Sequence, residues 1–200
     1  ISNNLAATYG NDMEYFDTTV EADTTFGTTT SFGIPDVNGL PTTVMHFTPS
    51  TAKWGGYKMY HGIAPKEGDS YVNQFTIVYD LYYPPQSDYL WRCLLQTGPT
   101  DSSDGDLFIN TSDGLGISGI YSGTITAVEW HRIAVAFDLT GPGQAPLLTK
   151  FVDGVKVGSQ TTGLSAKDGR FALDTFALLF ADEDGDVAEG YVSSVQISSG

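Results

Sequence analysis

Apolar and polar residues alternate along this chain in short runs that are separated by turn-forming residues. The clearest run spans residues 130–138. Ile133 and Val135 share one face of this run, and Arg132 lies on the other. A period of two residues is typical of a β-strand with one buried face, because successive side chains point to opposite sides of a sheet. The run therefore predicts a strand whose core face is apolar.

The same alternation predicts strands over most of the remaining sequence, and no segment has a convincing helical period. The predicted strands are residues 44–47, 56–60, 71–81, 90–97, 106–110, 114–118, 151–152, 155–157, 174–180 and 191–197. Asp153-Gly154 joins two of them and favours a type I′ turn, because both central positions of that turn need positive φ angles. The first 30 residues are polar and rich in threonine, which predicts an edge strand or a loosely held arm. The pattern predicts an all-β fold, an antiparallel two-sheet β-sandwich.

Length and charge narrow the class of protein. The 200 residues suffice for one sizeable core, and we expect a single domain over residues 1–200. The formal net charge of -15 disfavours nucleic acid and anionic membrane surfaces as partners. No apolar run reaches the roughly 18 residues that a membrane-spanning helix needs, so we expect no membrane insertion. The single Cys93 cannot form an internal disulfide and is predicted to be a buried thiol.

Composition also bears on where the protein works. Lysine and arginine are few, whereas threonine, serine, tyrosine and glycine are abundant, which fits a secreted, extracellular protein. The sequence opens at Ile1 without the charged and apolar regions of a signal peptide. We therefore expect a processed piece that was excised from a larger secreted protein.

Three segments, taken in order, carry a resemblance to a known superfamily. They are Trp130-His131-Arg132-Ile133-Ala134, the hairpin Phe151-Val152-Asp153-Gly154, and the closing strand of residues 189–197. Over residues 70–200 their order and spacing resemble the laminin-G-like, concanavalin A-like jelly-roll superfamily. The resemblance implies two curved antiparallel sheets, in a superfamily that includes carbohydrate-binding modules, adhesion domains, lectins and glycan-cleaving enzymes. Fold alone does not choose among these functions.

Carboxylates crowd into a turn that follows an apolar strand near the C-terminal end. Asp182, Asp184 and Asp186 alternate around a glycine, and Glu189 follows them. Calcium takes six to eight hard oxygen ligands in flexible geometry, so these four residues are the predicted calcium ligands. The alternative is a solvated acidic turn. A second acidic run, residues 101–106, is a further candidate for the same ion.

A sugar site needs polar groups for the hydroxyls and aromatic rings for the apolar face of a pyranose. Arg92 and Arg132 are predicted on the non-core faces of their strands. The alternative for each arginine is a structural ion pair with an aspartate such as Asp80. Trp91 and Trp130 fall on apolar faces and are predicted in the core. The predicted ligand-binding residues are Arg132, Arg92, Gln96, Trp54 and Tyr57.

Signatures of an enzyme are missing from the sequence. The Glu-x-Asp-x-x-Glu strand motif of retaining glycosidases is absent, as are a Gly-x-Ser-x-Gly elbow and a P-loop. No catalytic residue is therefore predicted. We interpret the chain as a non-catalytic carbohydrate-binding module that recognises a polysaccharide and is stabilised by calcium. A laminin-G-type adhesion domain that binds proteins and a polysaccharide-cleaving enzyme of the same fold are the alternatives.

Overall fold

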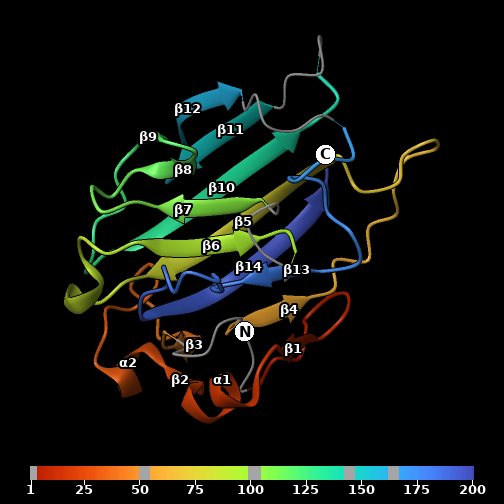
Figure 1. Ribbon diagram of the computed structural model, residues 1–200. Coiled ribbons are helices and arrows are strands. Elements are labelled where there is room, and N and C mark those ends of the chain that lie inside the picture. The colour runs from red at the N-terminus through yellow and green to blue at the C-terminus, as the bar shows by residue number, and fades with distance from the viewer. Residues whose placement is uncertain (1–3, 50–54, 99–104, 142–146, 162–166) are drawn as a thin grey trace.

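The protein is a sandwich of two antiparallel β-sheets (Figure 1). The computed structural model describes residues 4–49, 55–98, 105–141, 147–161 and 167–200. Each sheet contains seven strands, and the described helices are short. The predicted all-β fold with two antiparallel sheets is therefore confirmed.

The two sheets form a front and a back layer in Figure 1. In order across the front sheet, the strands are β1 (Met13–Tyr15), β4 (Tyr57–Met59), β13 (Ala177–Leu179), β6 (Arg92–Gln96), β7 (Asp106–Ile109), β8 (Leu115–Ile117) and β9 (Ile120–Ser122). In order across the back sheet, they are β12 (Val155–Thr161), β11 (Leu147–Val152), β10 (Trp130–Asp138), β5 (Gln74–Tyr82), β14 (Gly190–Ser199), β3 (Thr43–Phe47) and β2 (Thr25–Thr28). The helices are α1 (Thr18–Asp23) and α2 (Thr29–Phe32), with a 3₁₀ turn η1 (Pro85–Ser87).

The core lies between the sheets, where alternating strands place their apolar faces. In β10, Ile133 and Val135 are fully buried and Arg132 points outward, as predicted. Phe75 of β5 stacks on Phe137 of β10 with ring centroids 4.4 Å apart. Burial of these side chains stabilises the sandwich because it removes apolar surface from water.

The hairpin between β11 and β12 has the predicted turn. Asp153 and Gly154 have φ angles of 51° and 80°, and Val152 pairs with Val155. Positive φ at both central positions is the requirement of a type I′ turn, whose twist matches that of the paired strands. The Asp153 carboxylate also accepts the backbone N–H of Arg132 at 2.8 Å, which fastens the turn to β10.

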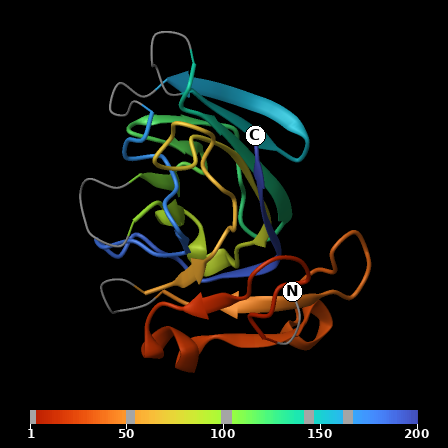
Figure 2. The ribbon, with the colours of Figure 1, turned by 90° about the vertical axis from the view of Figure 1, so that its right-hand side faces the viewer.

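The N-terminal segment forms one end of the sandwich in both views (Figure 2). Its strand β1 pairs with β4 and its strand β2 pairs with β3, so the edge-strand alternative is confirmed. The two helices were not predicted, because six and four residues are too few to show a helical period. Trp130 is half-buried against this segment instead of in the core, and its Nε1 donates to the Pro35 carbonyl at 2.6 Å. No helix in the described part of the chain has the length and apolar character needed to cross a membrane.

Strand β6 departs from the predicted alternation. Its register against β7 shifts between Cys93 and Leu95, which marks a β-bulge. The bulge puts Arg92 and Gln96 on opposite faces, although regular alternation would place them on the same one. Arg92 points into the sandwich and is fully buried, so its predicted position on the non-core face is wrong. The Cys93 thiol is buried, as predicted.

The last strand, β14, lies inside the back sheet. It pairs with β5 from Tyr191 to Ser199, and with β3 from Gly190 to Val192. Strands β3 and β2 are therefore joined to the rest of the sheet through β14.

Candidate functional site

The predicted sugar-binding residues do not share one surface. Arg132 lies on the outer face of the back sheet, Gln96 lies on the outer face of the front sheet, and Arg92 is buried between the sheets. Tyr57 is a core residue, only 1% exposed. Trp54 lies outside the described residues. The prediction of one groove formed by these side chains is wrong, because β6 and β10 belong to different sheets.

Arg132 forms the ion pair that was its alternative interpretation. Its Nε and Nη2 donate to the two carboxylate oxygens of Asp80 at 2.7 and 2.8 Å. The arginine side chain is 62% exposed. Ion pairs in contact with water contribute only about 0–1 kcal/mol, because solvent screens the charges and both side chains lose freedom.

We therefore expect Arg132→Ala to lower the free energy of unfolding by no more than about 1 kcal/mol. Urea unfolding of the variant beside the wild type measures this difference. Sugar affinity should also stay unchanged, because the arginine is already paired with Asp80. If the variant is folded but no longer binds sugar, Arg132 belongs to the binding site after all.

The four predicted calcium ligands lie in two different places. Asp182, Asp184 and Asp186 share the loop after β13, where Asp182 Oδ2 accepts the backbone N–H groups of the other two at 3.1 and 2.9 Å. Glu189 instead contacts the back sheet, with its Oε1 2.8 Å from His46 Nε2. Glu189 is therefore not placed with the loop carboxylates.

A residue of the second acidic run joins the loop instead. Carboxylate oxygens of Asp106, Asp182 and Glu183 all lie within 4.8 Å of one another, and we call these three residues the acidic cluster. Gln96 lies opposite Asp106 in the register of β6 and β7. Its Nε2 donates to Glu183 Oε2 at 2.5 Å. The fold thus unites two acidic runs that are far apart in the sequence.

The loop holds its carboxylates partly out of water. Burial raises the pKa of the Asp182 carboxyl above its ordinary value, and the negative charges of Asp186 and Asp184 add to that shift. Burial also raises the pKa of Asp186, again with a contribution from Asp184. The backbone N–H of Cys93 donates to the Asp186 carbonyl at 2.8 Å, so the loop is fixed against β6. A cation or hydrogen-bond donors beside these partly buried carboxylates would stabilise their charged form.

Three aromatic rings pack together on the outer face of the front sheet. Trp91 contacts Phe108 and Tyr121 edge-to-face, with ring centroids 5.6 Å apart in both pairs. All three are half-buried, so the predicted core position of Trp91 is wrong. Burial raises the pKa of Tyr121, and the charges of Asp186 and Asp106 contribute to the shift. Asp106 and Phe108 are two residues apart on β7 and share its outer face, so this aromatic cluster, Trp91, Phe108 and Tyr121, lies beside the acidic cluster.

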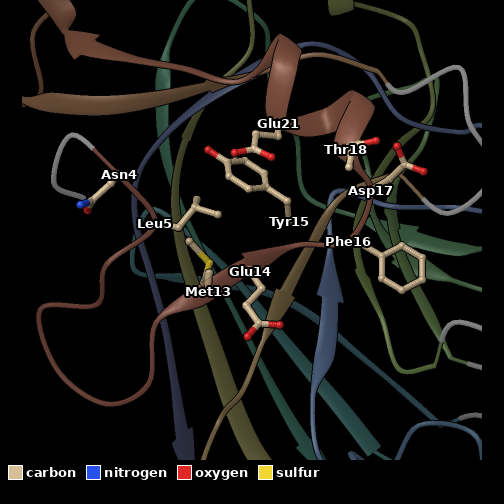
Figure 3. A pocket seen from close by; sticks show the side chains of 9 residues that line it. All are labelled: Asn4, Leu5, Met13, Glu14, Tyr15, Phe16, Asp17, Thr18 and Glu21. Atoms are coloured by element: carbon tan, nitrogen blue, oxygen red, sulfur yellow. The ribbon is translucent and has the colours of Figure 1, made fainter.

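Two surface pockets lie beside the N-terminal segment. One, of about 650 Å³, is bordered by β1 and α1 (Figure 3). Tyr15 lies beside Glu21 in it, whereas Phe16 points away. The other, of about 560 Å³, lies between residues 5–13 and β14, and the fully exposed Tyr9 borders it. Among the described residues, the carboxylates that line the first pocket, Glu14, Asp17 and Glu21, are not grouped as closely as those of the acidic cluster, so we take the outer face of the front sheet as the candidate site.

Solved structures show what this architecture is similar to. An endo-β-1,4-glucuronan lyase from the fungus Trichoderma reesei is 12% identical, with a TM-score of 0.52 over 88% of this chain and 87% of the lyase. An alginate lyase from Chlorella virus is 12% identical, with a TM-score of 0.52 over 94% of this chain and 99% of that chain. A glycoside hydrolase family 131 catalytic domain from Coprinopsis cinerea is 14% identical, with a TM-score of 0.50 over 94% of this chain and 83% of that chain.

The chain has the concanavalin A-like jelly-roll fold. The resemblance noted in its sequence is thereby confirmed at the level of the fold. The closer resemblance to laminin-G domains stays a prediction. No protein-family model and no curated protein matches the sequence. At these identities the likeness to other concanavalin A-like structures concerns the fold, and the function has to be argued from the site.

Proposed function

We propose that the protein is a non-catalytic module that binds a neutral polysaccharide on the outer face of its front sheet. The observation that carries this proposal is the aromatic cluster of Trp91, Phe108 and Tyr121 beside the acidic cluster on that one face. Aromatic rings stack on the apolar face of a sugar ring, and carboxylates accept hydrogen bonds from its hydroxyls. Solved structures with the same fold include a glucuronan lyase and an alginate lyase, which supports a polysaccharide as the class of ligand.

Charge favours a neutral polymer over an acidic one. The protein has a formal net charge of -15, and the aromatic cluster lies next to Asp106 and Asp186. A polymer that carries carboxylates would meet like charges at this face, which costs affinity. Lys58, on the outer side of β4, has its ammonium over the rings of Phe16 and Phe176, 5.1 and 5.6 Å from their centroids. This positive charge therefore already contacts two aromatic rings of the protein itself.

In affinity electrophoresis, we expect at least one neutral polysaccharide in the gel to slow the migration of the protein. Alginate in the gel should leave its migration unchanged. Trp91→Ala should weaken binding at least about tenfold, because it removes the ring that contacts both others. The melting temperature of the variant shows that it is folded. Tyr9→Ala is the matched control, since that tyrosine is fully exposed and far from the aromatic cluster in the sequence. Loss of binding in Tyr9→Ala alone would move the site to the pocket beside residues 5–13.

One observation favours hydrolysis as a second candidate function. Retaining glycosidases hold two carboxyl groups about 5–5.5 Å apart, and oxygens of Asp106 and Glu183 lie within 4.8 Å of each other. Glu183 is already engaged with Gln96, which disfavours a nucleophile's role. A reducing-end assay on the bound polysaccharide distinguishes the two functions. If the wild type releases sugar and both Asp106→Asn and Glu183→Gln do not, the protein is a hydrolase and not a non-catalytic module.

A further inference from the structure

The acidic cluster is built from two separate parts of the fold. Asp106 is the first residue of β7, whereas Asp182 and Glu183 lie in the loop after β13. Strands β6 and β7 are neighbours in the front sheet, and β13 is the neighbour of β6 on its other side. The sheet therefore fixes Asp106 and the loop relative to each other, and it does so in spite of the repulsion among their carboxylates.

A second feature at the same place is a buried oxygen without a partner. Gln96 has no exposed surface, and among the described residues nothing donates a hydrogen bond to its Oε1. The other end of the same amide donates to Glu183, and the residue opposite it on β7 is Asp106. The amide oxygen is thus held at the acidic cluster, where a group that attracts oxygens would satisfy it. A buried carbonyl left without such a group is destabilising.

We propose that Asp106, Asp182, Glu183 and the amide oxygen of Gln96 bind a calcium ion. These side chains offer only oxygen atoms, which are the ligands of hard cations, whereas zinc sites are built mostly from nitrogen and sulfur. Calcium accepts six to eight oxygens in flexible geometry, so carboxylates that bind through both oxygens, and water, complete the shell. Magnesium demands a stricter octahedral geometry and gives up its bound water reluctantly, so we expect these residues to bind it more weakly than calcium.

The ion accounts for both features at once. Its charge offsets the repulsion among the three carboxylates, and its coordination satisfies the Gln96 oxygen. It also ties the loop of residues 182–186 to β6 and β7, next to the aromatic cluster. The proposal does not rest on sugar binding, because the ligands are all side chains of this chain and the ion is bound in the absence of glycan.

The test is calorimetric titration of chelator-treated protein with calcium chloride, without sugar. We expect one ion per chain, a higher melting temperature in millimolar calcium, and at least tenfold weaker binding of magnesium. Asp106→Asn and Gln96→Met should each weaken calcium binding at least tenfold. Glu67→Gln is the matched control, because it removes one exposed carboxylate outside the acidic cluster and should leave affinity unchanged.

Two results would overturn the proposal. One is that millimolar calcium gives no heat of binding in the calorimeter and no rise in melting temperature. In that case water, and not calcium, would satisfy the Gln96 oxygen. The other is equal weakening by Asp106→Asn and Glu67→Gln, which would indicate diffuse screening of the net charge. If Asp106→Asn does not fold, Gln96→Met decides alone, because it preserves the charge and the size of the side chain. Retention on a polysaccharide is measured separately and tests the proposed function, whereas calcium binding without sugar tests this proposal.

Discussion

Arg92→Ala is expected to lower the free energy of unfolding by about 3–5 kcal/mol. Arg92 is fully buried, and its Nη2 donates to Asp113 Oδ1 at 2.5 Å. Its guanidinium lies over the Tyr83 ring, 4.9 Å from the centroid, and Nη1 donates to the Ile125 carbonyl at 3.3 Å. Removal of the arginine leaves the carboxylate of Asp113 with little water and no cation, and such an uncompensated charge is strongly destabilising.

Urea unfolding measures this effect, and Arg132→Ala is the matched control. Both substitutions remove an arginine that is paired with an aspartate, but only Arg92 is buried. A second variant that also carries Asp113→Ala should lose less stability than the sum of the two single changes, because it leaves no lone charge. Equal losses for Arg92→Ala and Arg132→Ala would contradict the assignment of Arg92 to the core.

The second large effect is expected at alkaline pH, where the protein should lose stability steeply above about pH 10. Burial raises the pKa of Tyr57, Tyr79 and Tyr83 well above the ordinary value of a phenol. In the unfolded chain these phenols release their protons near pH 10, whereas in the folded protein they retain them. The unfolded state then binds fewer protons, so stability is fully present below pH 10 and falls as the pH rises. Three such groups correspond to a slope of about 4 kcal/mol per pH unit.

Urea unfolding at a series of alkaline pH values gives this slope. Tyr79→Phe should reduce it by about one third. Its hydroxyl donates to the Leu94 carbonyl inside the sandwich, at 3.0 Å. Tyr89→Phe, which removes an exposed hydroxyl, is the control and should leave the slope as it is. An equal slope in Tyr79→Phe and in the wild type would contradict the assignment of the Tyr79 phenol to the core.

The parts of the fold that the sequence predicted are those governed by local rules. Residues 130–138 alternate without interruption, and β10 has those bounds. The Asp153-Gly154 turn is specified by two residues whose backbone preferences are known. The bulge in β6 has no such signature, because it depends on how β6 meets β7, and it reverses the face of Arg92.

The candidate site was harder to predict because it is assembled across the sheet. The acidic loop at residues 182–186 was recognised from its composition, but its partner Asp106 could be found only once the strand order was known. The aromatic cluster was missed for the same reason, since it needs the neighbours β7, β8 and β9 side by side. Lys150 is a further case: its ammonium is buried and donates to the Leu115 carbonyl and to Gln160 Oε1, both at 3.0 Å. Nothing in the local sequence distinguishes it from a surface lysine.

The place of β14 in the back sheet also determines when the chain can complete its folding. During synthesis from the N-terminus, β2, β3 and β5 leave the ribosome long before β14, which must lie between β3 and β5. Until residues 190–199 are available, β3 has no neighbour on that side and β5 presents an unpaired edge. Pairings between strands distant in sequence form slowly, and unpaired edges are sites of aggregation. The back sheet therefore cannot close before β14 has been synthesised, and until then the edges of β3 and β5 are open to other strands.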